Sequence, residues 1–252
     1  MEIIKKQHHL DLLPGDVAET VFLPGDISRA KLIADHFDEA HFVAKKRQYN
    51  TYTGTYQGVP VSVTSTGIGG PAVAIAVEEL IKVGAKNFIR IGTGGLLQTW
   101  LPVPGLIIAT AVVRGDGTSR EYFPLEYPAV ADWQVVEAMV QAAEKRDIQA
   151  FPGITRGHDT FYAESIFGDF EVCLERDRQW IDSNVLITSN EASTLFPLAM
   201  VRGCRAGAIE VGVDCHIRPY GEATSEEVAT AIDQAIKISL DAAVTLFHID
   251  HL

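Results

Sequence analysis

Apolar and polar positions alternate along the chain in two kinds of block. Short runs of branched apolar residues, typical of buried strands, are separated by longer segments with apolar residues at helical spacing. The expected strands are Thr20–Leu23, Thr51–Tyr56, Val59–Ser65, Asn87–Gly92, Leu106–Val113, Gly153–His158, Val185–Thr188 and Ala206–Val213. The expected helices are Ser28–His36, Pro71–Val83, Asp132–Arg146 and Glu191–Arg202, with a last one beginning after Thr224. This alternation predicts an α/β protein whose mixed sheet is covered by helices on both faces.

The last helix has the clearest signature. Thr224 is followed three residues later by Glu227, which is the spacing of a capping box. Apolar residues then recur on one helical face at Val228, Ile232 and Ile236. We expect this helix to be structural and assign it no chemistry.

No repeat or Pro/Gly/Ser-rich linker divides the 252 residues, so we expect a single domain over residues 1–252. The longest nearly unbroken apolar run, Leu106–Val113, is far shorter than the roughly 20 residues of a membrane-spanning helix. The segment Met1–Leu10 has no apolar stretch of the kind found in secretory signals. A cytoplasmic location is the default expectation, and no membrane is expected as a partner.

Charge and cysteine content narrow the function further. A net charge of −12, from 33 acidic and 21 basic residues, argues against nucleic acid as a partner. An acidic protein can still bind a small anion where it concentrates its arginines, so their positions are informative. The three cysteines contain no CxxC pair and indicate neither a disulfide framework nor a zinc site. Cys173 and Cys204 are expected to be buried free thiols.

Three glycine-rich turns are expected beside arginines. In Pro24-Gly25-Asp26, glycine permits a sharp reversal before a helix whose N-terminus could bind an anion, with Arg29 one turn further on. Such a turn can equally be only a turn. The second, Ser65–Ala72, fits a dinucleotide fingerprint, but the acidic residue expected about 20 positions later is missing. The third is expected at Gly92–Gly95.

Arg90 is the sharpest anomaly, because it interrupts an otherwise apolar strand. A buried arginine needs an anionic partner. Two partners are open: a carboxylate of the protein, or a bound phosphate to which Thr93 would add a hydroxyl.

Several blocks together resemble the nucleoside phosphorylase family of the purine/uridine type, and most closely its uridine phosphorylase branch. These blocks are STGIGGPAVAIAVEEL at 65–80, RIGTGG at 90–95, RGDGTSREYFPLEYPA at 114–129 and HDTFY at 158–162. The resemblance runs from about His9 to the C-terminal helix. It implies a three-layer α/β/α domain with a mixed central sheet. It also implies homo-dimers, commonly grouped into homo-hexamers, with active sites at the dimer interface.

The resemblance assigns phosphate to five positions. These are Gly25, Arg29, Arg90 and Thr93, with Arg47 lent by a neighbouring subunit. Arg47 alone could equally be a solvated residue in a basic run. Inorganic phosphate is thereby expected as a co-substrate, with no cofactor.

The sugar and base positions are only partly kept. By resemblance Glu191 binds the sugar hydroxyls, although it could equally be a glutamate favoured at a helix N-terminus. Arg90, Thr93 and Glu191 are expected to carry catalysis. By resemblance His9 is lent to the site of a neighbouring subunit, where it would contact the 5′-hydroxyl of the sugar; His8 could take this position instead. Asn190 is expected to bind the sugar beside Glu191. The residues expected around the base are Phe161, Ser165, Phe167 and Arg218. Phe161 would stack on the base, but it could also be a core residue.

Departures from the uridine branch put base identity in doubt. Ser189 and Asn190 stand where that branch has an acid and a methionine, and Ser165 and Phe167 stand where it reads uracil with a glutamine and an arginine. Cys215 occupies the position of the purine branch's protonating aspartate, unless the strand shifts and presents Asp214.

Base recognition could be restored by side chains elsewhere in the sequence. Arg176, Gln179 or Arg218 could complete the base site from another position.

Gln48 and Ala72 stand where the resemblance places the oxygen ligands of a potassium ion, so no metal is expected.

These patterns favour phosphorolysis of a nucleoside by inverting displacement, with a modified or broad base preference. A hydrolytic nucleosidase would not need the phosphate arginines. A regulatory ligand-binding protein on a degenerate phosphorylase scaffold stays open because of the altered sugar and base positions. A dinucleotide-dependent oxidoreductase is least favoured, for want of the acidic residue.

Overall fold

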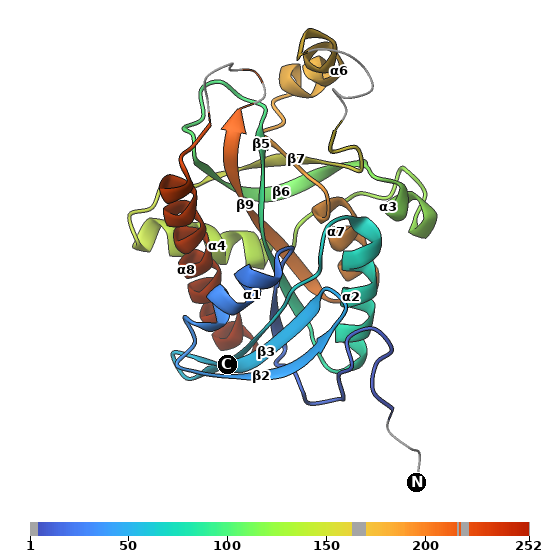
Figure 1. Cartoon of the computed structure of the whole chain (residues 1–252), viewed down its shortest axis with the longest axis vertical. Helices are drawn as coiled ribbons and strands as arrows, with labels where there is room; N and C mark the ends of the chain where they lie inside the picture. The colour runs from blue at the N-terminus through green and yellow to red at the C-terminus, as the bar shows by residue number, and fades with distance from the viewer. Residues whose placement is uncertain (1–4, 163–169, 216, 218–221, 252) are drawn as a thin grey trace.

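The structure is a computed structural model that describes residues 5–162, 170–215, 217 and 222–251 (Figure 1). Its strands form one mixed sheet of nine, in the order β2-β3-β4-β1-β5-β8-β7-β6-β9. Their bounds are β1 Thr20–Pro24, β2 Glu39–Lys46, β3 Tyr49–Tyr56, β4 Val59–Thr64, β5 Asn87–Leu96, β6 Gly105–Gly115, β7 Phe151–His158, β8 Ile187–Ser189 and β9 Arg205–Cys215.

Strand β5 is the centre of this sheet. It pairs in parallel with β1 and β9 and in antiparallel orientation with β8. Because β5 pairs with β9 as well as β8, the strands β5, β8, β7, β6 and β9 close into a ring. One apolar cluster takes a residue from each of these strands: Leu96, Ile107, Phe151, Ile187 and Cys215. The ring is therefore filled by side chains.

Helices cover both faces of the sheet. Their bounds are α1 Ile27–Ala34, α2 Gly70–Lys82, α3 Gly117–Tyr122, α4 Trp133–Lys145, α6 Phe170–Asp182, α7 Ala192–Val201 and α8 Ser225–Asp250. Helices α1, α4 and α8 share one apolar core with the sheet, and α2 and α7 share another on the opposite face (Figure 1). The expected three-layer α/β/α fold is confirmed. Within the described residues, no helix is both long and apolar enough to cross a membrane.

The capping box of the last helix is present. The Thr224 hydroxyl accepts from the Glu227 backbone N–H, while the Glu227 carboxylate accepts from the Thr224 backbone N–H at 2.8 Å. Of the expected thiols, Cys204 is half-buried and free, and the side chain of Cys173 lies outside the described part. Strand β2 and the helices α3 and α6 were not predicted.

The predicted third glycine turn is wrong, because β5 continues through it to Leu96. These glycines are needed for close packing instead of a reversal. A Cβ on Gly92 would lie 1.8 Å from Oε2 of Glu210, and one on Gly94 would lie 2.0 Å from the carbonyl oxygen of Thr188. The absence of a side chain at Gly92 and Gly94 therefore leaves space for the Glu210 carboxylate and the Thr188 carbonyl.

Candidate functional site

A cavity of about 750 Å³ lies where the N-terminal ends of α1 and α2 meet the C-terminal parts of β5 and β8. Seven of the predicted site residues line it: Gly25, Arg29, Arg90, Thr93, Phe161, Asn190 and Glu191. They come from four separate segments of the chain. The other lining residues are Asp26, Ile27, Gln48, Gly67 and Ile68. The fold thus assembles most of the expected phosphate and sugar positions in one place.

Two glycine turns that line this cavity are hydrogen-bonded to each other. Backbone N–H groups of Thr66 and Gly67 each donate to the turn before α1, to the carbonyls of Pro24 and Gly25, at 2.9 Å. A Cβ on Gly25 would approach the carbonyl oxygen of Gly67 to 3.1 Å. A side chain at residue 25 would therefore crowd the second turn, which is in direct contact with the first.

Arg90 is buried between two carboxylates. Its Nη2 forms an ion pair with Oε2 of Glu191, and its Nε donates to Oε1 of Glu210 at 3.2 Å. Burial opposes the charge, but the two carboxylates together raise the pKa of Arg90 and keep it cationic. The protein-carboxylate partner left open by the sequence is therefore present. Among the described residues Nη1 has no hydrogen-bond partner, and phosphate binding there stays a prediction.

Glu210 is the residue that sequence reasoning missed. It is the only charged residue in the apolar run Ala206–Val213 of β9, which is the same anomaly that marked Arg90 in β5. Register explains their contact, since Glu210 lies opposite Gly92, two residues beyond Arg90 on the same face of the sheet. Burial and the neighbouring Glu191 raise the pKa of Glu210 above its usual range, despite Arg90.

Residue 189 is a serine where the uridine branch has an acid, but the carboxylate of Glu210 lies close to it. Ser189 ends β8, and its hydroxyl donates to Oε1 of Glu210 at 2.8 Å. A carboxylate thus reaches this side of the site from β9 instead of from residue 189.

Arg29 adds a second cation to the cavity. It is half-buried, and its Nη1 donates to the carbonyl of Ile91 at 3.3 Å. Burial, followed by the positive charge of Arg90, lowers the pKa of Arg29. Both arginines line the cavity, and two like charges this close favour an anionic ligand beside them.

Glu191 directs its side chain into the cavity. It is the N-cap residue of α7 but makes no side-chain capping bond. Instead Oε1 accepts from the backbone N–H of Gly69 at 2.6 Å, while Oε2 contacts Arg90. The alternative of a simple helix-terminal glutamate does not describe these contacts. Its role toward the sugar stays a prediction.

Two residues expected from a neighbouring subunit do not line the cavity of their own chain. Arg47 is exposed in the β2–β3 turn, where its φ of 55° is in the left-handed region. His9 is fixed to α2, where its backbone N–H and ring Nδ1 both lie within hydrogen-bond distance of Glu79. Both placements agree with residues that serve a neighbouring subunit, and that role stays a prediction.

The base side of the site is described only in part. Phe161 lines the cavity with 67% of its surface exposed, which rules out a core role in this chain. Ser165, Phe167 and Arg218 lie outside the described residues.

The positions expected to protonate the base do not line the cavity. A β-bulge between Gly212 and Asp214 shifts the end of β9, and Cys215 packs in the apolar cluster of the ring. Arg176 lines a different and smaller cavity, of about 280 Å³.

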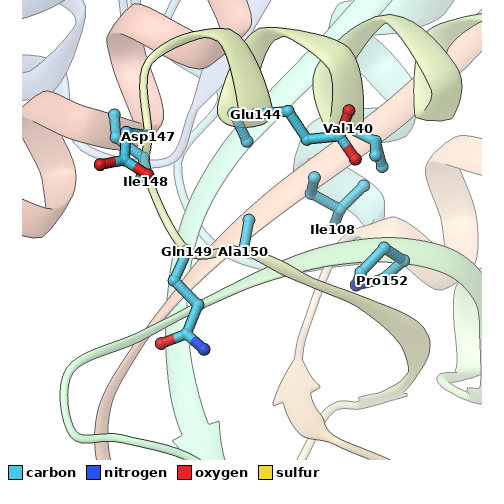
Figure 2. A pocket seen from close by; sticks show the side chains of 9 residues that line it. Ile108, Val140, Glu144, Asp147, Ile148, Gln149, Ala150 and Pro152 are labelled. Carbon is cyan, nitrogen blue, oxygen red and sulfur yellow. The ribbon is translucent and has the colours of Figure 1, made fainter.

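A further cavity, of about 590 Å³, lies between α4, β6 and the start of β7 (Figure 2). Its charged lining residues are Glu144 and Asp147, with no lysine or arginine. It therefore lacks the chemistry to hold phosphate.

No group of three or more His, Cys, Asp and Glu side chains is placed to hold a metal ion within the described ranges. The expected absence of a potassium ion near Gln48 and Ala72 remains a prediction.

Comparisons with known proteins agree with this geometry. The phosphorylase superfamily profile matches residues 19–247. A uridine phosphorylase of Thermococcus kodakarensis is 43% identical over 92% of this chain and 86% of its own length. A guanosine phosphorylase of Halorubrum lacusprofundi is 38% identical over 96% of this chain and 99% of its own. A purine nucleoside phosphorylase of Toxoplasma gondii, solved with immucillin-H, superposes with a TM-score of 0.89 at 28% identity over 98% of both chains.

These matches extend across nearly the whole chain, and the fold carries most of the residues that the resemblance assigned to the site. The chain belongs to the phosphorylase superfamily.

Proposed function

We propose that this chain is a nucleoside phosphorylase that converts a nucleoside and inorganic phosphate into a free base and a pentose 1-phosphate. The observation that carries the proposal is the convergence of Arg29, Arg90 and Thr93 on a cavity that also holds Glu191. A phosphate dianion would supply the anionic partner that the two arginines favour. Its neighbours would be the Gly25 turn and the Thr93 hydroxyl.

The reaction is a direct displacement. A phosphate oxygen approaches the anomeric carbon from the face opposite the base, a C–O bond forms, and the C–N bond breaks with its electron pair going to the base. Positive charge develops on the sugar in the transition state, and the phosphate dianion beneath it stabilises that charge. The configuration at the anomeric carbon inverts.

The sugar and base are assigned to the other side of the cavity. Glu191, with Asn190 beside it, would accept hydrogen bonds from the sugar hydroxyls, since a carboxylate can accept from two neighbouring hydroxyls. Phe161 would stack on the base. The departing base needs a hydrogen-bond donor, and of the residues predicted around the base Ser165 and Arg218 have side chains that can donate.

A second copy of the chain would complete the site. Ile68 and Phe161, which line the cavity, are 78% and 67% exposed, and a neighbouring subunit would cover them. His9 and Arg47, which do not line the cavity of their own chain, would be supplied from that neighbour. We therefore propose a homo-dimer, or a homo-hexamer made of dimers, with shared active sites.

The base preference is proposed to differ from that of a strict uridine enzyme, and the names of the relatives already differ between uridine and guanosine. We further propose that residues 1–252 form one domain acting in the cytoplasm in nucleoside salvage, without a cofactor. The test is incubation with a panel of nucleosides, with and without phosphate, followed by detection of pentose 1-phosphate. Base release without phosphate would favour a nucleosidase, and no turnover would favour a regulatory ligand-binding protein.

A further inference from the structure

Glu210 is buried in a cluster with Arg90, Glu191 and Ser189, and the reaction outlined above gives Glu210 itself no role. Its side chain is fully buried, and Oε1 accepts from both Arg90 Nε and Ser189 Oγ. Burying a second carboxylate beside Glu191 costs free energy, which the contacts with Arg90 and Ser189 must offset. The cluster therefore needs an explanation beyond packing.

The contacts of Arg90 are divided among its three nitrogens. Nε is held by Glu210 and Nη2 by Glu191, while Nη1 has no partner among the described residues. A planar guanidinium held at two nitrogens cannot rotate, so the direction of the third is fixed. Nη1 is itself buried, so an anion would meet Arg90 at the part of the guanidinium that lines the cavity, whose position the two carboxylates fix in advance.

The surrounding sequence leaves space for this carboxylate. Gly92 lies opposite Glu210 across the strand pair, and a Cβ there would lie 1.8 Å from Oε2 of Glu210 and 2.9 Å from Nη2 of Arg90. Any larger residue at position 92 would displace one of the two side chains. The contact between the Glu210 and Arg90 side chains over β5 thus depends on glycine at this position.

We propose that Glu210 is a positioning residue for Arg90, and that with Ser189 it holds the guanidinium in the orientation that binds phosphate. This inference rests on the proposed function. Glu210 itself would contact neither phosphate nor nucleoside, since it does not line the cavity. It acts through Arg90.

The test compares Glu210→Ala with Glu210→Gln. The alanine variant removes the acceptor for Nε, whereas glutamine keeps an acceptor oxygen of the same reach. We expect Glu210→Ala to lower kcat/KM for phosphate by about 10- to 100-fold, because small misplacements of a substrate-binding group have effects of this order. The KM for nucleoside should change much less, and Glu210→Gln should recover most of the loss.

A transplant variant provides a second arm. Ser189 Oγ lies 2.8 Å from Glu210 Oε1, so a glutamate at 189 can bring its carboxylate to the same region once Glu210 is removed. Ser189→Glu combined with Glu210→Ala should therefore bind phosphate more tightly than Glu210→Ala alone. Asp241→Asn is the matched control, since it neutralises a different carboxylate that also pairs with an arginine, Arg146, between α8 and the end of α4 and away from the cavity.

Calorimetric titration with inorganic phosphate separates the two claims, because it does not require turnover. Phosphate binding by a wild-type protein that forms no pentose 1-phosphate would refute the proposed function and leave the role of Glu210 measurable. A folded Glu210→Ala variant that binds phosphate as tightly as the wild type, or more tightly, would overturn the positioning role. So would a kinetic effect no larger than that of Asp241→Asn.

Discussion

The ring Nδ1 of His9 lies 2.8 Å from Oε1 of Glu79, which fixes the histidine to helix α2 of its own chain. Burial opposes the charge of Glu79, but hydrogen bonds from His9 and Leu10 lower its pKa, so it is ionised and can only accept. Nδ1 therefore carries the proton, and Nε2 is free of it when the ring is neutral. Glu79 lies ten residues after Gly69, about 15 Å along the helix from the cavity. His9 therefore does not reach the cavity of its own chain, which is what its predicted role as a lent residue requires.

Subunit complementation tests this arrangement. Arg47→Ala and Glu191→Gln should each inactivate the enzyme, because one removes the lent residue and the other a residue of the cavity itself. Co-assembled in equal amounts, the two variants should regain about a quarter of the wild-type activity, since half of the dimers are mixed and each has one intact site. A mixture as inactive as its parts, or a fully active monomer in light scattering, would refute shared sites.

Arg90→Ala should lower turnover by about 10²–10³, equivalent to about 2.7–4 kcal/mol of transition-state stabilisation, because it removes a charged donor from a desolvated site. The affinity for phosphate should fall with it. Since the substitution also leaves Glu191 and Glu210 without their cation, thermal unfolding must be measured alongside the steady-state kinetics. Arg202→Ala is the control, an exposed arginine that pairs with Glu78. An unchanged dependence on phosphate in the Arg90 variant would remove the assignment.

Sequence reasoning identified Arg90 but not its partner, for a physical reason. A lone arginine in an apolar strand shows that an anion is near, but its register against a strand 120 residues later is not visible in local periodicity. Glu210 carried the same signal in β9, and pairing the two anomalies would have found the contact. The three-layer fold was predictable because buried strands and amphipathic helices have local hydrophobic patterns that can be recognised in the sequence.

Other elements could not be predicted in this way. β2 contains mostly exposed residues, so its pattern is not that of a buried strand, and α3 has only six residues. The glycines of β5 were mistaken for a turn because glycine also permits close packing, which only the folded structure reveals. Seven of the predicted site residues gather at one cavity, whereas His9 and Arg47 need a second chain to be tested.

Asp116 should contribute to stability in a pH-dependent way. It is buried, caps α3 through the backbone N–H of Ser119 at 2.7 Å, and accepts from the hydroxyl of Thr194 on α7 at 2.8 Å. Burial opposes its charge, but the hydrogen bonds around it lower the pKa of Asp116 below its ordinary value.

Its contribution is therefore full above the unfolded pKa of about 3.9 and is lost as the pH falls through the lower folded value. Asp116→Asn should cost about 1–3 kcal/mol of unfolding free energy at pH 7, and the difference from the wild type should shrink below pH 4. Urea unfolding at a series of pH values measures this. A difference independent of pH would show that the charge has no part in it.

Base selectivity should be weak. Cys215 packs in the apolar ring cluster and cannot protonate a purine, and Ser165 and Phe167 lack the groups that clamp a uracil edge. Buried polar clamps of this kind are worth about 10⁴–10⁵ in discrimination when complete. We expect comparable specificity constants for uridine, thymidine, inosine and adenosine, or a preference for a modified nucleoside. A specificity constant for uridine of about 10⁵ M⁻¹s⁻¹ or more, far above the others, would contradict this expectation.

The dependence of product formation on phosphate tests the central claim most directly. The wild-type protein, incubated with the nucleoside panel, should release base only when inorganic phosphate is present and should form one pentose 1-phosphate for each base released. The α-anomer should arise from a β-nucleoside, because the displacement inverts the anomeric carbon. Base release at the same rate without phosphate, giving free pentose, would contradict the account, as would the absence of turnover on every nucleoside tested.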